Sequence, residues 1–144
     1  MLRSILFYPG VILSLIISPI ALIRIKYLEI RGKDKERTNA IFKITHSWAK
    51  YVMWLSGAKI NVHGRENIIR DEAVLFVSNH QSYFDIPLIM STIDVPQGFI
   101  AKKELEKWPF VSMWMKYMHC VFMDRENIRK SAKRYFFGYK SQWI

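Results

Sequence analysis

The chain has 144 residues, of which 51% are hydrophobic and 24% are charged, and its formal net charge is +10. This balance excludes an intrinsically disordered protein, which has too few apolar residues, and a fully membrane-embedded protein, which has too few charges. The positive charge predicts an anionic partner, and the five Trp, seven Tyr and nine Phe favour a bilayer surface over nucleic acid, because aromatic rings gather at headgroup level.

Residues 5–23 carry no charge, and nineteen helical residues would just cross a hydrocarbon core of about 30 Å. Pro9, Gly10 and Pro19 would break or kink so short a span, so the segment can instead dip into one leaflet. A cleaved signal peptide is the rival interpretation, but the small-residue cleavage site that it requires is absent. Residues 24–37 carry six basic and three acidic residues, which predicts that the chain lies on the cytoplasmic face of the inner (plasma) membrane, held integrally or monotopically by its N-terminal helices.

Residues 38–57 predict a second helix, because apolar side chains recur there at spacings of three and four. Thr38 or Asn39 can cap the start of this helix, and Gly57 suits its end. A helix of this kind either lies in the membrane plane or packs on a soluble core, and the apolar N-terminus favours the membrane. We therefore expect residues 1–56 to form a membrane-anchoring helical pair. Its second helix has a polar face and candidate interfacial rings: Lys43, His46 and Lys50, with Trp48, Tyr51 and Trp54.

After Gly57 the apolar segments are short and alternate between strand and helix patterns. The predicted helices span residues 87–93 and 104–118. This alternation predicts an α/β fold for residues 57–144, with a partial, mostly parallel sheet flanked by helices. In such sheets the chemistry gathers beyond the carboxyl ends of the strands. The predicted strands are residues 58–64, 73–78, 97–102 and 120–124.

The stretch SNHQSYFDIP, residues 78–87, follows the predicted strand 73–78 with a polar cluster. On an ideal helix a five-residue offset separates two side chains by about 140°, and on a strand it puts them on opposite faces. His80 and Asp85 therefore converge only if the chain turns between them. Taken singly, Asp85 can be a simple N-cap and His80 a loop residue. If they converge, the carboxylate accepts from one imidazole nitrogen and leaves the other free to act as a general base.

The motifs NHQSYFD, AKKELEKWPF and CVFMDREN follow one another in this order. The first resembles the His-x-x-x-x-Asp block of the glycerolipid acyltransferases, the family of 1-acylglycerol-3-phosphate (lysophosphatidic acid) acyltransferases. The second is similar to the Ala-Lys-x-Glu-Leu segment and following Pro-Phe of that family, and the third to its second block, a strand that ends in Asp-Arg or Arg-Arg. The resemblance covers residues 1–130 approximately, because the N-terminal helical pair is similar to the membrane-docking element of bacterial members.

This resemblance implies an O-acyltransferase of phospholipid biosynthesis. A fatty acyl group would move from acyl-CoA or acyl-carrier protein to the free hydroxyl of 1-acyl-sn-glycerol 3-phosphate, giving phosphatidic acid. His80 matches the general base and Asp85 its orienting partner. Lys102 and Arg125 match positions associated with the acceptor phosphate, where two cations suit charge-assisted hydrogen bonds. Asn79 is expected to orient the loop.

The implied mechanism needs no metal and no enzyme nucleophile, because the acceptor alkoxide itself attacks the thioester. We expect no cofactor beyond the acyl donor, which is a co-substrate. The single thiol, Cys120, is expected to be a packing residue, and Lys103 and Lys107 to be solvated surface charges. The expected partners are an anionic phospholipid membrane, lysophosphatidic acid and the acyl donor, and not nucleic acid.

Two further blocks of the family are absent: a Glu-Gly-Thr-Arg segment after another strand, and a strand containing Val-Pro. The tail YFFGYKSQWI, residues 135–144, suggests a C-terminally truncated or frame-shifted reading in which residues 57–144 are an incomplete acyltransferase domain. This pattern puts the activity of this exact polypeptide in doubt. The alternatives are a non-catalytic membrane-surface binding fragment, and an acyltransferase that acts on another lyso-lipid or on glycerol 3-phosphate.

Overall fold

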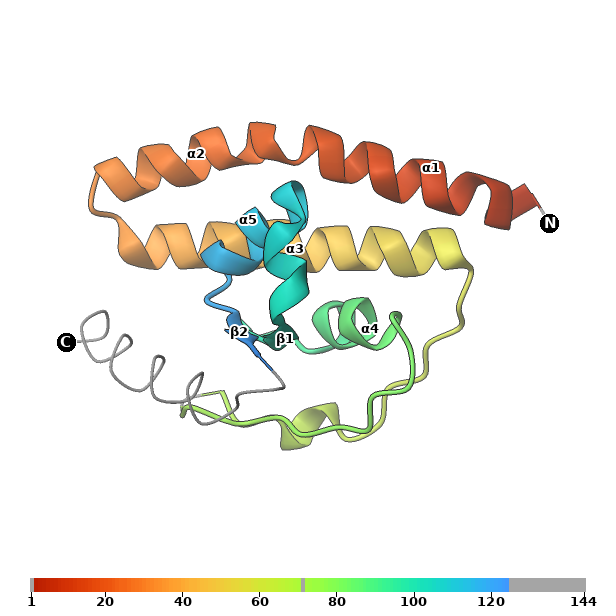
Figure 1. Ribbon diagram of the computed structural model, residues 1–144. Helices are drawn as coiled ribbons and strands as arrows, with labels where there is room; N and C mark the ends of the chain where they lie inside the picture. Colours follow the sequence, from red (N-terminus) through yellow and green to blue (C-terminus); the bar gives the residue numbers. More distant parts are fainter. Residues whose placement is uncertain (1, 71, 125–144) are drawn as a thin grey trace. The chain divides into compact units, whose positions relative to one another are not determined.

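The computed structural model describes residues 2–70 and 72–124 (Figure 1). The chain divides into two compact units, Met1–Pro96 and Gln97–Ile144. The first unit contains the helices α1 (Leu2–Ile17), α2 (Pro19–Ile30), α3 (Asp34–Ser56) and α4 (Asp85–Thr92), with a short 3₁₀ turn, η1 (Arg65–Asn67). The second contains the strands β1 (Ile100–Lys102) and β2 (Val121–Met123), the 3₁₀ helix η2 (Lys103–Lys107) and the helix α5 (Pro109–Tyr117).

Helices α1 and α2 run nearly end to end, and α3 returns along both of them (Figure 1). α1 continues through Pro9, so the expected break at that residue does not occur. The Ser18 amide still donates to the Ser14 carbonyl at 3.0 Å, and α2 then begins with Pro19, whose fixed φ suits a first helical turn. Together they form a 26-residue helical stretch, Ile5–Ile30, that by length and composition could cross a membrane.

Helix α3 begins four residues earlier than predicted, so the expected cap at Thr38 or Asn39 is wrong. Its first turn carries Asp34 and Glu36, whose negative charges suit the positive end of the helix dipole. The predicted end is confirmed: Gly57 has φ 72°, a left-handed conformation that glycine adopts without steric cost.

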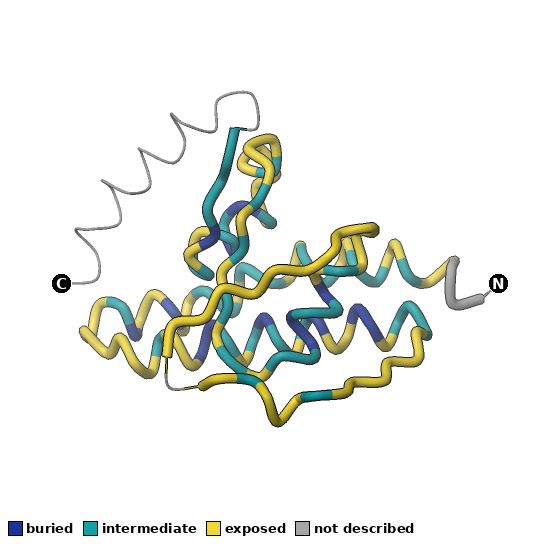
Figure 2. Tube along the Cα trace, turned by 90° about the horizontal axis from the view of Figure 1, so that it is seen from below, coloured by how far each residue is buried: buried dark blue, intermediate teal, exposed yellow. Residues whose placement is uncertain are grey.

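The interior of the first unit lies between α3 and its neighbouring helices (Figure 2). Ile25 of α2 is fully buried, and α3 contributes the largest group of buried side chains. The contact between α1 and α3 is close at Gly10, where an added Cβ would lie 2.9 Å from Leu55 Cδ1. Beside it the Trp48 indole N–H donates to the Ser14 hydroxyl at 3.0 Å. The other buried apolar side chains of α2 and α3 are Leu28, Ala40, Ile41, Ala49, Val52 and Met53.

Most of the exposed side chains of α1 and α2 are apolar, and eleven large ones among them are at least half exposed. We call this set of side chains the apolar face; a contiguous exposed patch of this kind marks an interaction with a membrane or another apolar partner. Among the described residues, no other pair of helices has as many exposed large apolar side chains. The apolar face consists of Ile5, Leu6, Tyr8, Ile12, Leu13, Ile16, Ile17, Ile20, Ile23, Tyr27 and Ile30.

The predicted strands 58–64 and 73–78 are wrong: both segments lack regular secondary structure. A strand exists only where a neighbour exchanges hydrogen bonds with it, and the sole sheet of the described residues is the pair β1–β2. The second segment nevertheless retains a two-residue period. Val74 and Phe76 are 40% and 44% exposed, whereas Leu75 and Val77 are 79% and 86% exposed. Residues 73–78 therefore have the sequence pattern of a strand, but no strand among the described residues pairs with them.

The second unit is a parallel strand–helix–strand arrangement. β1 pairs with β2 in the register Ile100↔Val121 to Lys102↔Met123, and η2 and α5 form the crossover between them. The predicted helix 104–118 divides at Pro109, which begins α5 and ends the preceding 3₁₀ turn. An N-terminal helical pair followed by a partial parallel sheet with flanking helices confirms the predicted fold class. The division into an anchoring segment, 1–56, and an enzymatic segment, 57–144, remains a prediction.

Candidate active site

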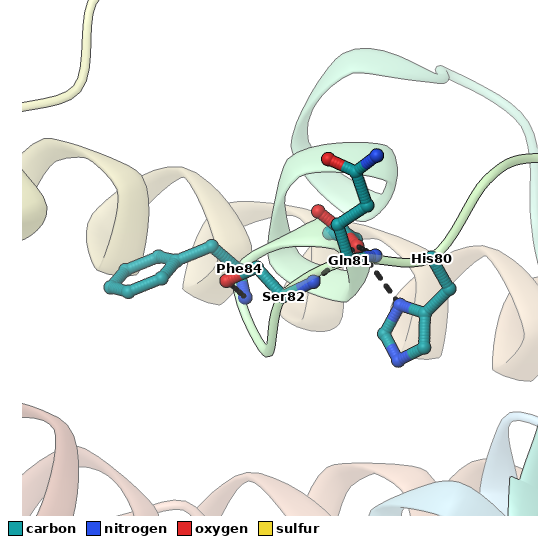
Figure 3. A network of polar contacts seen from close by, with 5 residues as sticks. His80, Gln81, Ser82 and Phe84 are labelled. Atoms are coloured by element: carbon teal, nitrogen blue, oxygen red, sulfur yellow. Dashed lines mark hydrogen bonds and ion pairs between the residues drawn. The ribbon is translucent and has the colours of Figure 1, made fainter.

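The segment between Asn79 and Asp85 folds back on itself in a tight turn (Figure 3). The Ser82 carbonyl accepts from the Asp85 amide at 3.1 Å, and the Ser82 hydroxyl accepts from the Phe84 amide at 3.2 Å. Serine favours such turns because its hydroxyl bonds the backbone two residues on. α4 begins immediately after this turn, with Pro87 buried in its first turn.

One carboxylate oxygen organises the turn. Oδ2 of Asp85 accepts from the backbone amides of Gln81 at 2.7 Å and Ser82 at 2.8 Å, and it lies 2.9 Å from His80 Nδ1 (Figure 3). All three donors precede α4, so Asp85 does not act as an ordinary N-cap, which would accept from amides inside its own helix. The residue at the N-cap position is Phe84, which makes no side-chain capping bond. The sequence therefore predicted correctly that the chain turns and brings His80 and Asp85 together.

The electrostatics fix the protonation pattern of the pair. The hydrogen bond from the Ser82 amide, then that from Gln81, and to a smaller extent His80, hold the pKa of Asp85 below its usual value, so this residue is an anion at neutral pH. A carboxylate can only accept, so His80 donates through Nδ1–H, and in the neutral ring the lone pair is then on Nε2. Within residues 2–70 and 72–124 nothing hydrogen-bonds to Nε2, and Figure 3 shows that side of the ring turned away from the carboxylate.

The His80 side chain is 58% exposed and that of Asp85 24% exposed. The orienting group is thus sheltered in the turn, while the basic nitrogen is accessible from outside. This is the arrangement required for general base catalysis, in which one imidazole edge is held and the other meets a substrate proton.

A mostly apolar, open groove of about 440 Å³ begins beside the turn. Phe84 and Leu88 of the turn and α4 form one wall, and Met53 and Ser56 of α3 form another. The remaining lining comes from residues 58–61. Phe84 also contacts Phe7 of α1, with ring centroids 5.4 Å apart, so the turn meets the helix that carries the apolar face.

The other predicted site residues lie outside the hydrogen-bonded turn of His80 and Asp85, or outside the described residues. Lys102 ends β1 in the second unit, where its ammonium group lies 3.0 Å from Glu104 Oε1. Arg125 lies outside the described residues. Asn79 is exposed and makes no hydrogen bond with any residue of the described ranges, so its predicted role in the loop stays a prediction. Lys103 is exposed, as predicted for a solvated surface charge, and its ammonium group lies 3.3 Å from Asp124 Oδ2.

The predicted packing role of Cys120 agrees with its surroundings. Its side chain is buried, the Phe99 amide donates to its sulfur at 3.4 Å, and burial raises its pKa to about 11. A thiol that is protonated at neutral pH is a poor nucleophile. Within the described ranges, 2–70 and 72–124, no three His, Cys, Asp or Glu side chains cluster as a metal site would require.

Sequence reasoning missed two features of the site. The amides of Gln81 and Ser82 hold Asp85 as firmly as His80 does, and a serine three residues before an aspartate is the signal that could have indicated this turn. The other is the contact of His46, which was predicted only as part of the polar face of the second helix: it is half-buried, and its Nδ1 lies 2.7 Å from the Met90 carbonyl of α4.

Comparison with known proteins adds independent information. A family model described as "Acyltransferase" matches residues 59–136. A 1-acyl-sn-glycerol-3-phosphate acyltransferase from Borreliella burgdorferi is 33% identical over 91 residues, which cover 63% of this chain and 36% of the relative. A lyso-ornithine lipid O-acyltransferase from Rhizobium meliloti is 31% identical over 85 residues, which cover 59% of this chain and 28% of the relative.

The crystal structure of the 1-acyl-sn-glycerophosphate (LPA) acyltransferase PlsC from Thermotoga maritima superposes with a TM-score of 0.80 at 28% identity. The alignment covers 97% of this chain and 56% of that protein. The chain thus spans little more than half of that structure, and well under half of the two curated relatives. Because the family model covers more than half of the 144 residues and the same fold recurs in PlsC, the predicted resemblance is confirmed, and the chain belongs to the acyltransferase family.

Proposed function

We propose that this chain transfers a fatty acyl group from acyl-CoA or acyl-carrier protein to the free hydroxyl of 1-acyl-sn-glycerol 3-phosphate, giving phosphatidic acid. The observation that carries the proposal is the 2.9 Å contact between His80 Nδ1 and Asp85 Oδ2, which leaves Nε2 basic and accessible. Family membership and the names of the Borreliella and Thermotoga relatives support the reaction type.

In the proposed reaction, His80 Nε2 takes the proton of the acceptor hydroxyl as its oxygen attacks the thioester carbonyl carbon. The new C–O ester bond forms and the C–S bond breaks. The leaving thiolate receives the proton back from His80, which restores the neutral imidazole. During this sequence the ring is transiently an imidazolium, and the Asp85 carboxylate beside Nδ1 stabilises that charge. No metal and no enzyme-bound acyl group is needed.

Two cations are proposed to hold the acceptor phosphate. Lys102 is exposed and forms an ion pair with Glu104, and a dianionic phosphate can replace that carboxylate as its partner. Arg125 would supply the bidentate grip that a guanidinium gives to phosphate oxygens. Asn79 is proposed to orient the loop before His80.

We also propose a location at the cytoplasmic face of the inner (plasma) membrane; the apolar face of α1 and α2 supports the membrane association. Burying one exposed Ile or Leu side chain in a hydrocarbon phase contributes about 1.5–3 kcal/mol, and the face has eleven large apolar side chains. Residues 24–37, which overlap the C-terminal end of this face, are rich in Lys and Arg, which attract anionic headgroups. Phe7 connects this face to Phe84, next to Asp85, so a lipid substrate would meet the base beside its own bilayer.

The acceptor is tested by offering lysophosphatidic acid, glycerol 3-phosphate and lyso-ornithine lipid to the purified chain in anionic vesicles with a radiolabelled acyl donor. The lyso-ornithine lipid arm is included because relatives from Rhizobium meliloti and Brucella abortus carry that name. The same panel is run on a version extended through the two absent family blocks. Labelled phosphatidic acid supports the proposal, and labelling of another acceptor alone would replace the proposed substrate. Equal rates for both versions would refute the idea that the missing blocks limit activity.

The apolar face also supports a second candidate, a membrane-surface module without chemistry. The substitution His80→Ala separates the two candidates, because an enzyme loses turnover and keeps vesicle binding. A binding module would show no turnover before or after the substitution, in either the native or the extended version.

A further inference from the structure

Helix α4 carries Asp85 in its first turn, and it is only two turns long. A helix of eight residues has little stability of its own, so its position depends on what holds it. Its side chains Pro87, Met90 and Ser91 are buried. The helix itself lies beside α3 (Figure 1). Because Asp85 is part of α4, the orientation of this helix sets the direction of Asp85 and His80, and directional contacts to α4 bear on the site.

The last turn of α4 has such a contact. The chain leaves the helix at Ile93, whose amide bonds to the Ile89 carbonyl, and the carbonyls of Met90 and Thr92 are then left without backbone donors. Side chains from two other elements fill these positions. His46 Nδ1 of α3 lies 2.7 Å from the Met90 carbonyl, and the Arg65 guanidinium donates to the Thr92 carbonyl at 3.2 Å.

The His46 bond is the more constraining of the two. His46 and the Met90 carbonyl are half-buried or buried and 44 positions apart, whereas the Arg65 bond is exposed. A carbonyl can only accept, so His46 must carry its proton on Nδ1. Its ring lies against Phe42, with centroids 5.1 Å apart, which restricts the plane from which it donates.

α4 is therefore held at both ends by different helices. At its start Phe84 contacts Phe7 of α1, and at its end Met90 is held by His46 of α3. From this geometry we infer that His46 is a positioning residue for the proposed acyl transfer: through the Met90 carbonyl it fixes the angle of α4, and thereby the direction in which the turn presents His80 Nε2. The inference rests on the proposed function for its catalytic consequence, but its structural consequence can be measured without turnover.

The test compares His46→Leu, which removes the donor, with His46→Asn, whose amide nitrogen is the same number of bonds from Cβ as Nδ1 and retains an N–H donor. Lys43→Leu is the matched control, because Lys43 is exposed on the same helix. In the unmodified chain, NMR should show a protected His46 Nδ1–H proton and cross-peaks between the Phe7 and Phe84 rings. His46→Leu should weaken these ring cross-peaks at least threefold, whereas His46→Asn and Lys43→Leu should keep them.

Activity provides a separate readout. Where acyl transfer is measurable, His46→Leu should lower kcat about tenfold or more with KM near that of the unmodified chain, because a misdirected base slows chemistry and leaves lipid binding intact. Unchanged Phe7–Phe84 cross-peaks in His46→Leu would overturn the inference, as would loss of these peaks in His46→Asn. If His46→Leu fails to fold, the unmodified chain still decides: a rapidly exchanging His46 Nδ1–H overturns the inference. Failure of acyl transfer in every version, with the NMR result as expected, would count against the proposed function alone.

Discussion

The substitution Asp85→Asn tests the proposed base most sharply, because it changes one charge and almost no volume. The new amide oxygen can still accept from the backbone amides of Gln81 and Ser82, which donate to Oδ2 at 2.7 and 2.8 Å in the unmodified chain. We therefore expect the turn and α4 to persist. What changes is the third contact, the 2.9 Å bond from His80 Nδ1.

The size of the effect follows from the number of donors on one atom. A neutral amide oxygen that already accepts two backbone hydrogen bonds is a much weaker partner for the imidazole than a carboxylate, whose charge-assisted bonds are roughly twice as strong. The Nδ1–H tautomer of His80 loses its preference, and the imidazolium of the transition state loses its counter-charge. The equivalent change in a Ser-His-Asp triad lowers kcat by about 10⁴-fold, so we expect a loss of about a thousandfold or more here.

Two assays follow the substitution. Acyl transfer to lysophosphatidic acid gives kcat, and ¹⁵N chemical shifts of His80 report which ring nitrogen carries the proton, with or without turnover. The matched control is Asp94→Asn, since Asp94 is a carboxylate of the same unit that pairs with Arg70 at 3.0 Å instead of with a histidine. If Asp85→Asn retains both the Nδ1–H tautomer and full kcat, the orienting role assigned to Asp85 is refuted.

Four further outcomes are expected. The pKa of Asp85 is lowered from its ordinary value of 3.8, chiefly by the hydrogen bond from the Ser82 amide, so its contribution to stability is complete above that value and is lost as pH falls below it. Unfolding measured as a function of acid pH should show this loss of stability, and the Asp85→Asn variant should not show it. Cys120, with its pKa raised to about 11 by burial, should resist iodoacetamide at pH 8 in the folded chain and react on unfolding, and rapid labelling of the folded chain would contradict its buried position. Gly98→Ala should lower the free energy of unfolding by about 1–3 kcal/mol in chemical denaturation, since the new Cβ would lie 2.9 Å from the Met118 carbonyl oxygen, and an unchanged midpoint would show that this turn can relax. The double substitution Ile16→Lys, Ile23→Lys should weaken binding to anionic vesicles at least tenfold in a sedimentation assay, whereas Leu75→Lys, a more exposed apolar site off the apolar face, should not.

The helical part of the fold could be predicted from sequence because its signals are local. Apolar spacing located α3, and Gly57 marked its end by the left-handed conformation that it adopts. The start of α3 was misplaced because Thr38 and Asn39 are good caps in isolation, whereas the chain reverses earlier, at Gly32, and places Asp34 in the first turn. The capping preference of Thr38 and Asn39 is therefore overridden by the packing of α3 beside α2, which requires the earlier reversal.

The strands could be predicted only as patterns. Residues 73–78 have the two-residue alternation of exposure that a strand shows, but pairing is a non-local property, and the described residues give this segment no neighbour. β1 and β2 do form, because they are joined by one short crossover and each is the pairing partner of the other. The same distinction explains the site. His80 and Asp85 were found because the turn between them is local, whereas the contact of His46 with Met90 joins residues 44 positions apart and left no local signal.

The central claim is that the imidazole of His80 removes the proton of a lipid hydroxyl. The most direct measurement compares acyl transfer to lysophosphatidic acid by the unmodified and His80→Ala proteins, each in the native and the extended version, together with vesicle binding of every sample. The account predicts phosphatidic acid from the version that carries the family's remaining blocks, a loss of about a thousandfold or more with His80→Ala, and unchanged vesicle binding. Equal product formation with and without the imidazole would contradict it.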